Sequence, residues 1–234
     1  MLTLRRAEDR GHSDLGWLSS HHTFSFGGYN DPRHMGFRAL RVINDDRVAA
    51  GKGFGAHGHR DMEILSYVVD GKLAHKDSMG EAHELGPNEV QAMSAGNGVI
   101  HSEYNASNTE PTHFLQIWIM PAEKSITPSY QQFAYDPAEK RGRLRLMAGP
   151  DANGGAARIN QDARMYATVI AAGEQVDVPI AAGRYAWVQC VTGDAEVNGL
   201  AIKTGDGVAV SDESRIVLRG AAPSGAELLL FDLA

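Results

Sequence analysis

Two short motifs place four side chains of metal-binding type at the spacing of a β-strand. They are His57-x-His59 and, about forty residues later, His101-x-Glu103. On a strand, residues i and i+2 point to the same face with Cα atoms roughly 6.5–7 Å apart, so each motif can direct two ligands at one ion. Two such strands crossing inside a barrel would offer three neutral imidazole nitrogens and one carboxylate oxygen. That donor set suits Fe(II), Ni, Cu, Mn or Zn better than Mg or Ca.

Each motif alone is weak evidence, because a chain with this much histidine yields an H-x-H by chance. The combination strengthens the prediction, since both motifs lie on plausible strands of one half of the chain. The alternative interpretation is that these histidines are exposed strand residues. Four protein ligands on a six-coordinate ion would leave two positions for substrate and dioxygen. A closed structural zinc site would more often use thiolates, and the only cysteine is Cys190, which we interpret as an inert core thiol.

The local surroundings of the other histidines indicate different roles for them. All ten histidines lie in the first 113 residues, so a histidine-based site must lie in the N-terminal half. The pair His21 and His22 is expected to line a pocket or to cap a loop. His113 lies on an apolar strand and is predicted to be a hydrogen-bonded core residue, while Gln116 is either a substrate contact or a structural amide. Polar surroundings predict a surface position for the remaining ones, His12, His34, His75 and His83.

Short β-rich segments bounded by Gly, Pro, Asn or Asp must position these residues. They run over residues 37–43, 64–69 and 113–120. Asp70-Gly71 is a typical signal for a type I′ β-hairpin turn. Helical periodicity is weak, and the best short helix is predicted over 136–140, where a proline lies in the first turn.

The second half of the chain resembles the first in pattern. The run 185–197 has the same strand–glycine–strand form as 64–75, and 205–210 resembles 86–93. Three prolines in a polar segment mark a boundary near 123–140. The sequence therefore predicts an all-β protein of two jelly-roll domains in tandem, residues 1–130 and 131–234, of which only the first has histidines with which to bind metal.

Composition excludes several classes of function. With 22 Lys and Arg against 29 Asp and Glu the net charge is −7, and no basic run indicates a nucleic-acid surface. The chain has no apolar run of about 18 residues that would cross a membrane, and its start lacks a secretory signal. A single cysteine forms no internal disulfide, so we expect a cytoplasmic protein.

Longer motifs make the chain similar to a known family. The pattern Gly51-x5-His57-x-His59-x3-Glu63 resembles the first cupin motif, and Gly96-x4-His101-x3-Asn105 resembles the second. The fuller strings 23–32, 57–71 and 93–103 resemble the pirin family of bicupins, in particular bacterial members similar to quercetin 2,3-dioxygenase. The resemblance covers essentially the whole chain and implies two cupin domains.

That resemblance also implies a ligand set, namely His57, His59, His101 and Glu103. Glu63 holds the usual first-motif glutamate position of cupins, but pirin-like proteins place the ligand carboxylate in H-S-E. We therefore expect Glu63 to be structural, oriented towards a ligand or a backbone amide. In the second domain the counterparts of His57 and His101 fall near Pro179 and within 215–220. No histidine is available there.

The resemblance implies a metal-dependent dioxygenase that opens the 2,3 bond of a quercetin-like flavonol with O2 and releases CO. We expect one divalent transition metal per chain, Fe(II) first, with Ni, Cu, Mn and Zn left open. Glu103 would be a ligand and also the general base for the substrate 3-hydroxyl. Aromatic residues and Met93 would form apolar pocket walls.

Two other functions remain open on the sequence alone. The first is a non-catalytic metal-binding redox sensor or regulatory module that acts through a protein partner. The second is a metal-independent isomerase on a cupin scaffold, because fold does not determine chemistry.

Overall fold

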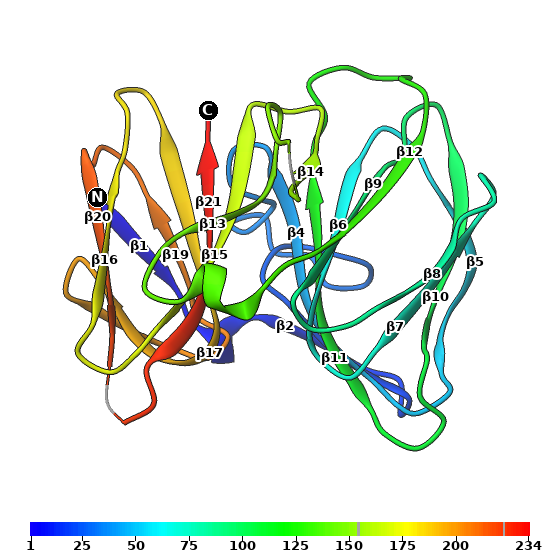
Figure 1. The fold of residues 1–234 in the computed structure, drawn as a ribbon, viewed down its shortest axis with the longest axis horizontal. Helices are drawn as coiled ribbons and strands as arrows, with labels where there is room; N and C mark the ends of the chain where they lie inside the picture. Colours follow the sequence, from blue (N-terminus) through cyan, green and yellow to red (C-terminus); the bar gives the residue numbers. More distant parts are fainter. Residues whose placement is uncertain (154, 222) are drawn as a thin grey trace. The chain divides into compact units, whose positions relative to one another are not determined.

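The computed structural model describes residues 1–153, 155–221 and 223–234, and these form strands joined by loops and turns (Figure 1). Two short 3-10 helices, η1 (Ala7–Asp9) and η2 (Pro137–Lys140), interrupt them, and the described residues contain no α-helix. The predicted all-β class is confirmed. No helix in the described part of the chain is long and apolar enough to cross a membrane.

The chain divides into two compact units. One comprises 11–135 with 150–161, and the other comprises 1–10, 136–149 and 162–234. The first ten residues thus belong to the unit that contains the C-terminus. The contiguous domains 1–130 and 131–234 stay a prediction.

The unit built on residues 11–135 consists of two antiparallel sheets. The larger has the strand order β12 (Ser129–Ala134), β9 (Glu89–Ser94), β6 (Glu63–Asp70), β11 (Thr112–Ile119), β4 (Leu40–Val48), β3 (Leu18–His22) and β2 (Gly11–Asp14). The smaller has the order β5 (Gly53–His59), β10 (Val99–Asn105), β7 (Leu73–Asp77) and β8 (Ala82–Leu85). Figure 1 shows β5 and β10 on one side of this unit and β4 and β6 on the other. The short strand β14 (Ala157–Arg158) lies against Gln131, whose side chain bonds both backbone groups of Arg158.

Apolar side chains from both sheets meet between them. One buried cluster joins the larger sheet to β7 and β8 and consists of Leu18, Val48, Val68, Leu73, Leu85 and Phe114. A second cluster consists of Ile64, Met93, Ala95 and Val99, the last from β10. Because both clusters contain residues of both sheets, burial of apolar surface fixes β10 against the larger sheet.

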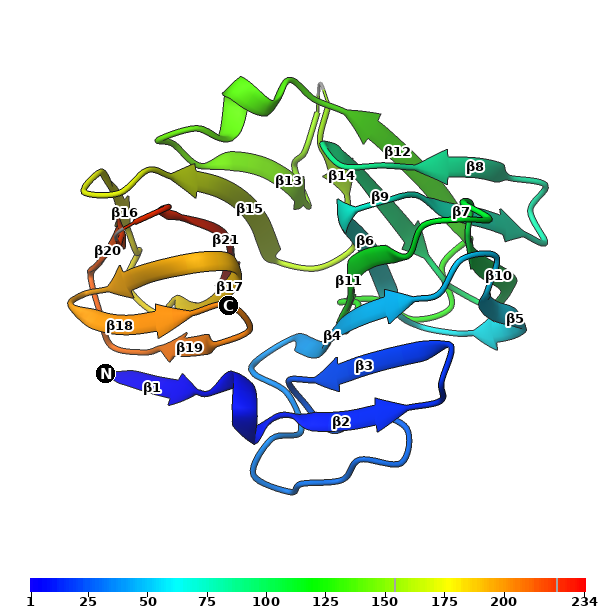
Figure 2. The ribbon, with the colours of Figure 1, turned by 90° about the horizontal axis from the view of Figure 1, so that it is seen from below.

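The second unit repeats this topology. Its larger sheet has the order β1 (Leu2–Arg5), β19 (Gly207–Val210), β17 (Tyr185–Val197), β21 (Ala226–Leu233), β15 (Ala163–Ile170) and β13 (Arg145–Gly149). Figure 2 shows β17, β18 (Leu200–Lys203) and β19 side by side, and β16 (Gln175–Pro179) pairs with β20 (Arg215–Gly220). The order β19-β17-β21-β15 matches β9-β6-β11-β4. The predicted internal repeat is therefore real at the level of strand order.

Where the first unit has its histidine motifs, the second has apolar residues. Strand β16 corresponds to β5 and β20 to β10, as the sequence comparison expected. Val178 pairs with Ile216 there, and both belong to a large buried cluster.

The predicted Asp70-Gly71 hairpin is wrong. Strand β6 pairs with β9 and β11, whereas β7 pairs with β8 and β10, so the turn carries the chain from one sheet to the other. Gly71 has φ +77°, but Asp70 does not have the positive φ that a type I′ turn requires. The predicted strands are confirmed with shifted ends as β4, β6 and β11. The predicted short helix is confirmed as η2, which Asp136 caps.

Candidate metal centre

Strands β5 and β10 bring the two histidine motifs together. In their antiparallel register His57 lies opposite His101, and His59 lies opposite Val99. The ring nitrogens of His57, His59 and His101 lie within 4.8 Å of one another. Their ring centroids are 4.5–4.7 Å apart. The structure thus brings together the three histidines that the sequence singled out.

A β-bulge in β5 shapes the space beside these rings. Between His101 and Glu103 on β10 there is one residue, but between their partners His57 and Phe54 on β5 there are two. The extra residue turns Phe54 to the same side as His57, so that both line one pocket. Simple alternation along β5 would have placed Phe54 on the opposite face.

Hydrogen bonding orients the His57 ring. Its Nδ1 donates to the backbone carbonyl of Gly55 at 2.8 Å, which leaves the lone pair of Nε2 directed at the cluster. Nε2 of His57 and Nε2 of His101 are 3.1 Å apart. Two nitrogens at this distance suit a shared cation or a shared proton.

Burial keeps two of the imidazoles neutral. It lowers the pKa of His59 to about 4, with help from the neighbouring His57. Burial, together with the surrounding histidines, lowers the pKa of His101 to about 2. Neutral imidazoles are the form that binds metal ions, so the state of these rings fits a metal site.

Glu103 lies next to this cluster, held by a polar network. Its Oε2 accepts from Nε2 of Gln116 at 2.5 Å, and its Oε1 is 3.2 Å from the Ser66 hydroxyl. The Ser66 hydroxyl also lies 3.1 Å from Oε1 of Gln116. Burial raises the pKa of Glu103 to about 7 despite these hydrogen bonds. A bound cation would favour its ionised form.

A buried histidine, His75, lies beside Glu103, although its polar sequence surroundings predict a surface position. The Glu103 carboxylate, His101 and His75 have ligand atoms within 4.8 Å of one another. We predicted His75 at the surface, but it is 2% exposed. It pairs with Asp77 at 3.0 Å and stacks on Tyr130. Strand β7 places it there by pairing with β10, where His75 lies opposite Glu103.

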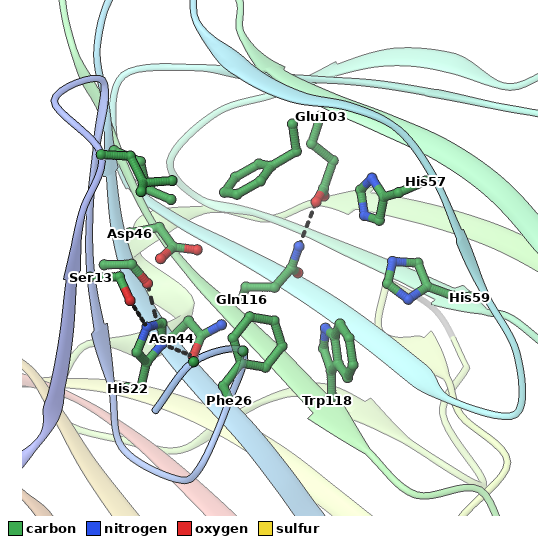
Figure 3. Close-up of a pocket in the computed structure, with 16 residues that line it drawn as sticks. Ser13, His22, Phe26, Asn44, Asp46, His57, His59, Glu103, Gln116 and Trp118 are labelled. Carbon is green, nitrogen blue, oxygen red and sulfur yellow. Dashed lines mark hydrogen bonds between the residues drawn. The ribbon is translucent and has the colours of Figure 1, made fainter. Parts of the chain in front are cut away.

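His57 and His59 line one end of a pocket of about 330 Å³, drawn in Figure 3, whereas His101 lies behind them outside its lining. This volume is within the range of small-molecule sites. Phe26, Phe54 and Trp118 form apolar walls, and Trp118 meets His59 edge to face with centroids 4.9 Å apart. Gln116 points into the same space, so it is both a partner of Glu103 and a pocket residue.

The remaining sequence predictions have mixed outcomes. Glu63 is buried and accepts from the Ser94 hydroxyl at 2.6 Å and from the backbone of Asn160, which fits the structural role expected. His113 is hydrogen-bonded to Asp45 at 2.7 Å. Met93 is fully buried in an apolar cluster and does not line the pocket, so that prediction is wrong.

Of the adjacent pair His21 and His22, only His22 faces the pocket. His21 instead stacks on His12, 4.4 Å away. Strand β4 adds two pocket residues that sequence reasoning missed, Asn44 and Asp46. Their i, i+2 spacing on an apolar strand was the available signal.

The donor set fits a divalent transition metal. Three imidazole nitrogens with no thiolate suit Fe, Ni, Cu, Mn or Zn, and Glu103 adds a hard oxygen nearby.

Comparison with known proteins agrees with this fold. Residues 3–119 match the family model described as Pirin, and residues 146–233 match the model of a quercetinase C-terminal cupin domain. The chain is 49% identical to a quercetin 2,3-dioxygenase of Escherichia coli K12 over 100% of this chain and 99% of that protein. It is 37% identical to a pirin-like protein of Caulobacter vibrioides, covering 100% of both.

A solved structure extends the comparison to the metal. The bacterial pirin YhhW of Escherichia coli in complex with nickel(II) superposes with a TM-score of 0.93 at 48% identity, covering 100% of this chain and 99% of that chain. The two family models, the similarity to these relatives over the full chain and the strand order that the two units share lead to one conclusion. This chain belongs to the pirin family and consists of two cupin folds in tandem.

Proposed function

We propose that this protein is a metal-dependent dioxygenase that cleaves the 2,3 bond of quercetin-like flavonols. Both atoms of O2 enter the ring-opened product, and carbon monoxide leaves. One observation carries the proposal: the imidazoles of His57, His59 and His101 converge beside a pocket of about 330 Å³, and a buried glutamate lines that pocket. The full-length similarity to a protein named quercetin 2,3-dioxygenase supports the choice of substrate.

The proposed ligands are His57, His59, His101 and Glu103. When bound, a divalent transition metal supplies a Lewis-acidic centre at which a deprotonated hydroxyl and dioxygen can be held together. We propose Fe(II) as the native ion, and nickel second, because the E. coli relative holds nickel in its crystal structure.

Glu103 has a second proposed role as the general base. Gln116 and Ser66 hold its carboxylate, and the residue lines the pocket, so one oxygen can accept the proton of the substrate 3-hydroxyl. Gln116 is placed to keep the carboxylate oriented while this proton is transferred. The acceptor oxygen would be Oε1, because its hydrogen bond from Ser66 is long, at 3.2 Å, whereas Oε2 accepts from the Gln116 amide at 2.5 Å.

The apolar walls orient the substrate and exclude water. Phe26, Phe54 and Trp118 offer aromatic faces for a planar ring system. Excluding water strengthens every electrostatic interaction at the reacting end. We also propose a cytoplasmic location, which the single buried thiol of Cys190 supports.

The test is removal of a ligand. His101→Ala and Glu103→Ala should each lower bound metal and quercetin-dependent oxygen consumption by roughly a hundredfold, because each removes a direct ligand. Chelation of the wild-type metal should abolish activity, and adding Fe(II) or Ni(II) should restore it. Elemental analysis and an oxygen electrode give the two readouts.

His113→Gln is the matched control, since His113 bonds to Asp45 and lies outside the pocket. It should keep metal and activity. Retention of both by either ligand variant would contradict the proposal. Metal-loaded wild-type protein that consumes no oxygen with any flavonol would instead favour a non-catalytic metal-binding role.

A further inference from the structure

The pocket has a second polar end that the proposed chemistry does not use. Figure 3 shows Ser13, His22, Asn44 and Asp46 gathered on the side away from His57 and His59. They come from β2, β3 and β4, whereas the imidazoles come from β5 and β10. Polar groups at both ends of an apolar pocket are typical of a site that orients an elongated ligand.

Asp46 is the most informative residue of this group. It is 3% exposed, and its Oδ1 has no hydrogen-bond partner among the described residues. The Ser20 hydroxyl hydrogen-bonds to the carboxyl group, and burial raises its pKa to about 7. Burying a carboxyl oxygen without a hydrogen-bond partner costs free energy. Because Asp46 lies on the wall of a pocket, this oxygen indicates that a bound ligand supplies the missing hydrogen-bond donor.

Asn44 supplies the complementary group. Its Oδ1 lies 2.8 Å from Nδ1 of His22, and Nε2 of His22 lies 2.9 Å from the Ser13 hydroxyl. With the amide in this orientation, the Asn44 nitrogen is the group that can donate to a ligand. Asn44 and Asp46 are two residues apart on β4, so they share the face that lines the pocket.

The pocket also has apolar walls. Phe26, Phe54, Trp118 and Leu18 line it together with Gln116 and Glu103. A ligand that satisfies all three zones has a flat aromatic body, one hydroxyl at the imidazole end and further hydroxyls at the other. Neighbouring ring hydroxyls both donate and accept, as the pair Asp46 and Asn44 requires.

We propose that Asp46 and Asn44 form a second binding subsite, which selects polyphenols carrying hydroxyls on the ring remote from the reacting hydroxyl. This inference rests on the proposed function only for the identity of the reacting end. Asp46 would accept a hydrogen bond from one hydroxyl, and the Asn44 amide would donate to the same or the adjacent one. His22 is a positioning residue, because it holds the Asn44 amide in its donating orientation.

The test compares two flavonols that differ only in that remote ring. Quercetin carries two neighbouring hydroxyls there, and 3,5,7-trihydroxyflavone carries none. Binding to the metal-loaded protein is measured without oxygen, through quenching of fluorescence from Trp118 and the other tryptophans. Wild type should bind quercetin about tenfold or more tightly than the trihydroxyflavone. In Asp46→Ala this ratio should fall towards one, with the affinity for the trihydroxyflavone unchanged within about twofold.

Two further variants keep the result interpretable. Asp46→Asn preserves the shape of the side chain and should give an intermediate ratio. Asp45→Ala is the matched control, because Asp45 is the adjacent carboxylate of β4, bonds to His113 and Arg47 and lies outside the pocket. It should keep the wild-type ratio.

Three results would overturn the proposal: equal wild-type affinities, no binding of either flavonol, or an Asp46→Ala variant with an unchanged ratio. An equal loss of affinity for both ligands would also overturn it, since Asp46 would then only maintain pocket shape. Oxygen consumption is measured separately. Selective binding without turnover would refute the dioxygenase proposal while leaving this subsite standing.

Discussion

At the scale of single residues, the site is built from groups whose burial decides their charge. His59 and His101 are kept neutral by burial and by neighbouring histidines, which is the state a metal ligand needs. Glu103 and Asp46 are buried carboxyls whose pKa values both rise to about 7. A divalent ion would offset the cost of burying Glu103, whereas nothing in the described protein pairs with Oδ1 of Asp46.

This cost predicts a pH dependence of stability. The folded-state pKa of Asp46 is about 7 and lies above the unfolded value of 3.8, so the folded protein binds the proton more tightly. Stability from this group is present at low pH and is lost as pH rises through about 7. Between pH 5 and 8, the free energy of unfolding of the wild type should fall by up to about 3 kcal/mol more than that of Asp46→Asn.

Urea unfolding of both metal-loaded proteins across that range measures the difference. Glu103 is present in both proteins and is one of the charges that raise the pKa of Asp46. Asp46→Asn should also be the more stable protein at pH 8, since it buries no charge. Parallel pH profiles for the two proteins would show that Asp46 is not the group responsible.

At the scale of elements, the pairing of β5 with β10 sets the geometry of the cluster. The bulge between His57 and Phe54 gives β5 one residue more than β10 and turns Phe54 towards the pocket. Close approach of the two strands needs Gly53, where a Cβ would overlap the backbone carbonyl of Glu103 and Cα of Tyr104.

Gly53→Ala should therefore push β5 away from β10 and separate His57 and His59 from His101. We expect a loss of about 1–3 kcal/mol of stability and at least a tenfold loss of metal affinity. Gly55→Ala is the control on the same strand, because a Cβ there would meet only the Tyr104 hydroxyl at 3.8 Å. Metal titration and urea unfolding are the measurements. Wild-type metal affinity in Gly53→Ala would contradict this account of the strand pair.

At the scale of the whole molecule, one strand order is used twice with different interiors. The first unit leaves a pocket between its sheets, while the second fills the corresponding region with aliphatic side chains such as Val178, Ile216 and Leu218. The chain of the second unit also includes β1 from the N-terminus, which pairs with β19. Leu2 and Leu4 of β1 pack against its core.

Leu4→Ser should consequently weaken the unit that contains the C-terminus. Loss of a partly buried leucine predicts about 1–2 kcal/mol of destabilisation. Hydrogen exchange should accelerate at the amides of β19 and β17, while β6 and β11 keep their wild-type rates. Thr3→Ala, on the exposed face of the same strand, should leave exchange unchanged. Faster exchange confined to β6 and β11 would contradict the assignment of β1 to the unit that contains the C-terminus.

The sequence alone determined which residue types could make a site and which faces they share. Alternation along a strand is local, so H-x-H, H-S-E and the strands β4, β6 and β11 could be predicted from spacing. The strand–glycine–strand pattern likewise revealed the repeat, because each copy has a glycine with positive φ at this point, Gly71 in one and Gly193 within β17 in the other. The role of Glu63 as a structural carboxyl also followed, from comparison with family motifs.

Only the tertiary structure decided which strands meet. The Asp70-Gly71 turn has the sequence of a hairpin, yet Gly71 leads the chain into the other sheet because β7 pairs with β10. That pairing buries His75 beside Glu103, and the pairing of β3 with β4 brings His22 to Asn44. Such contacts join residues far apart in the chain, and their free energy comes from burial that no local pattern encodes.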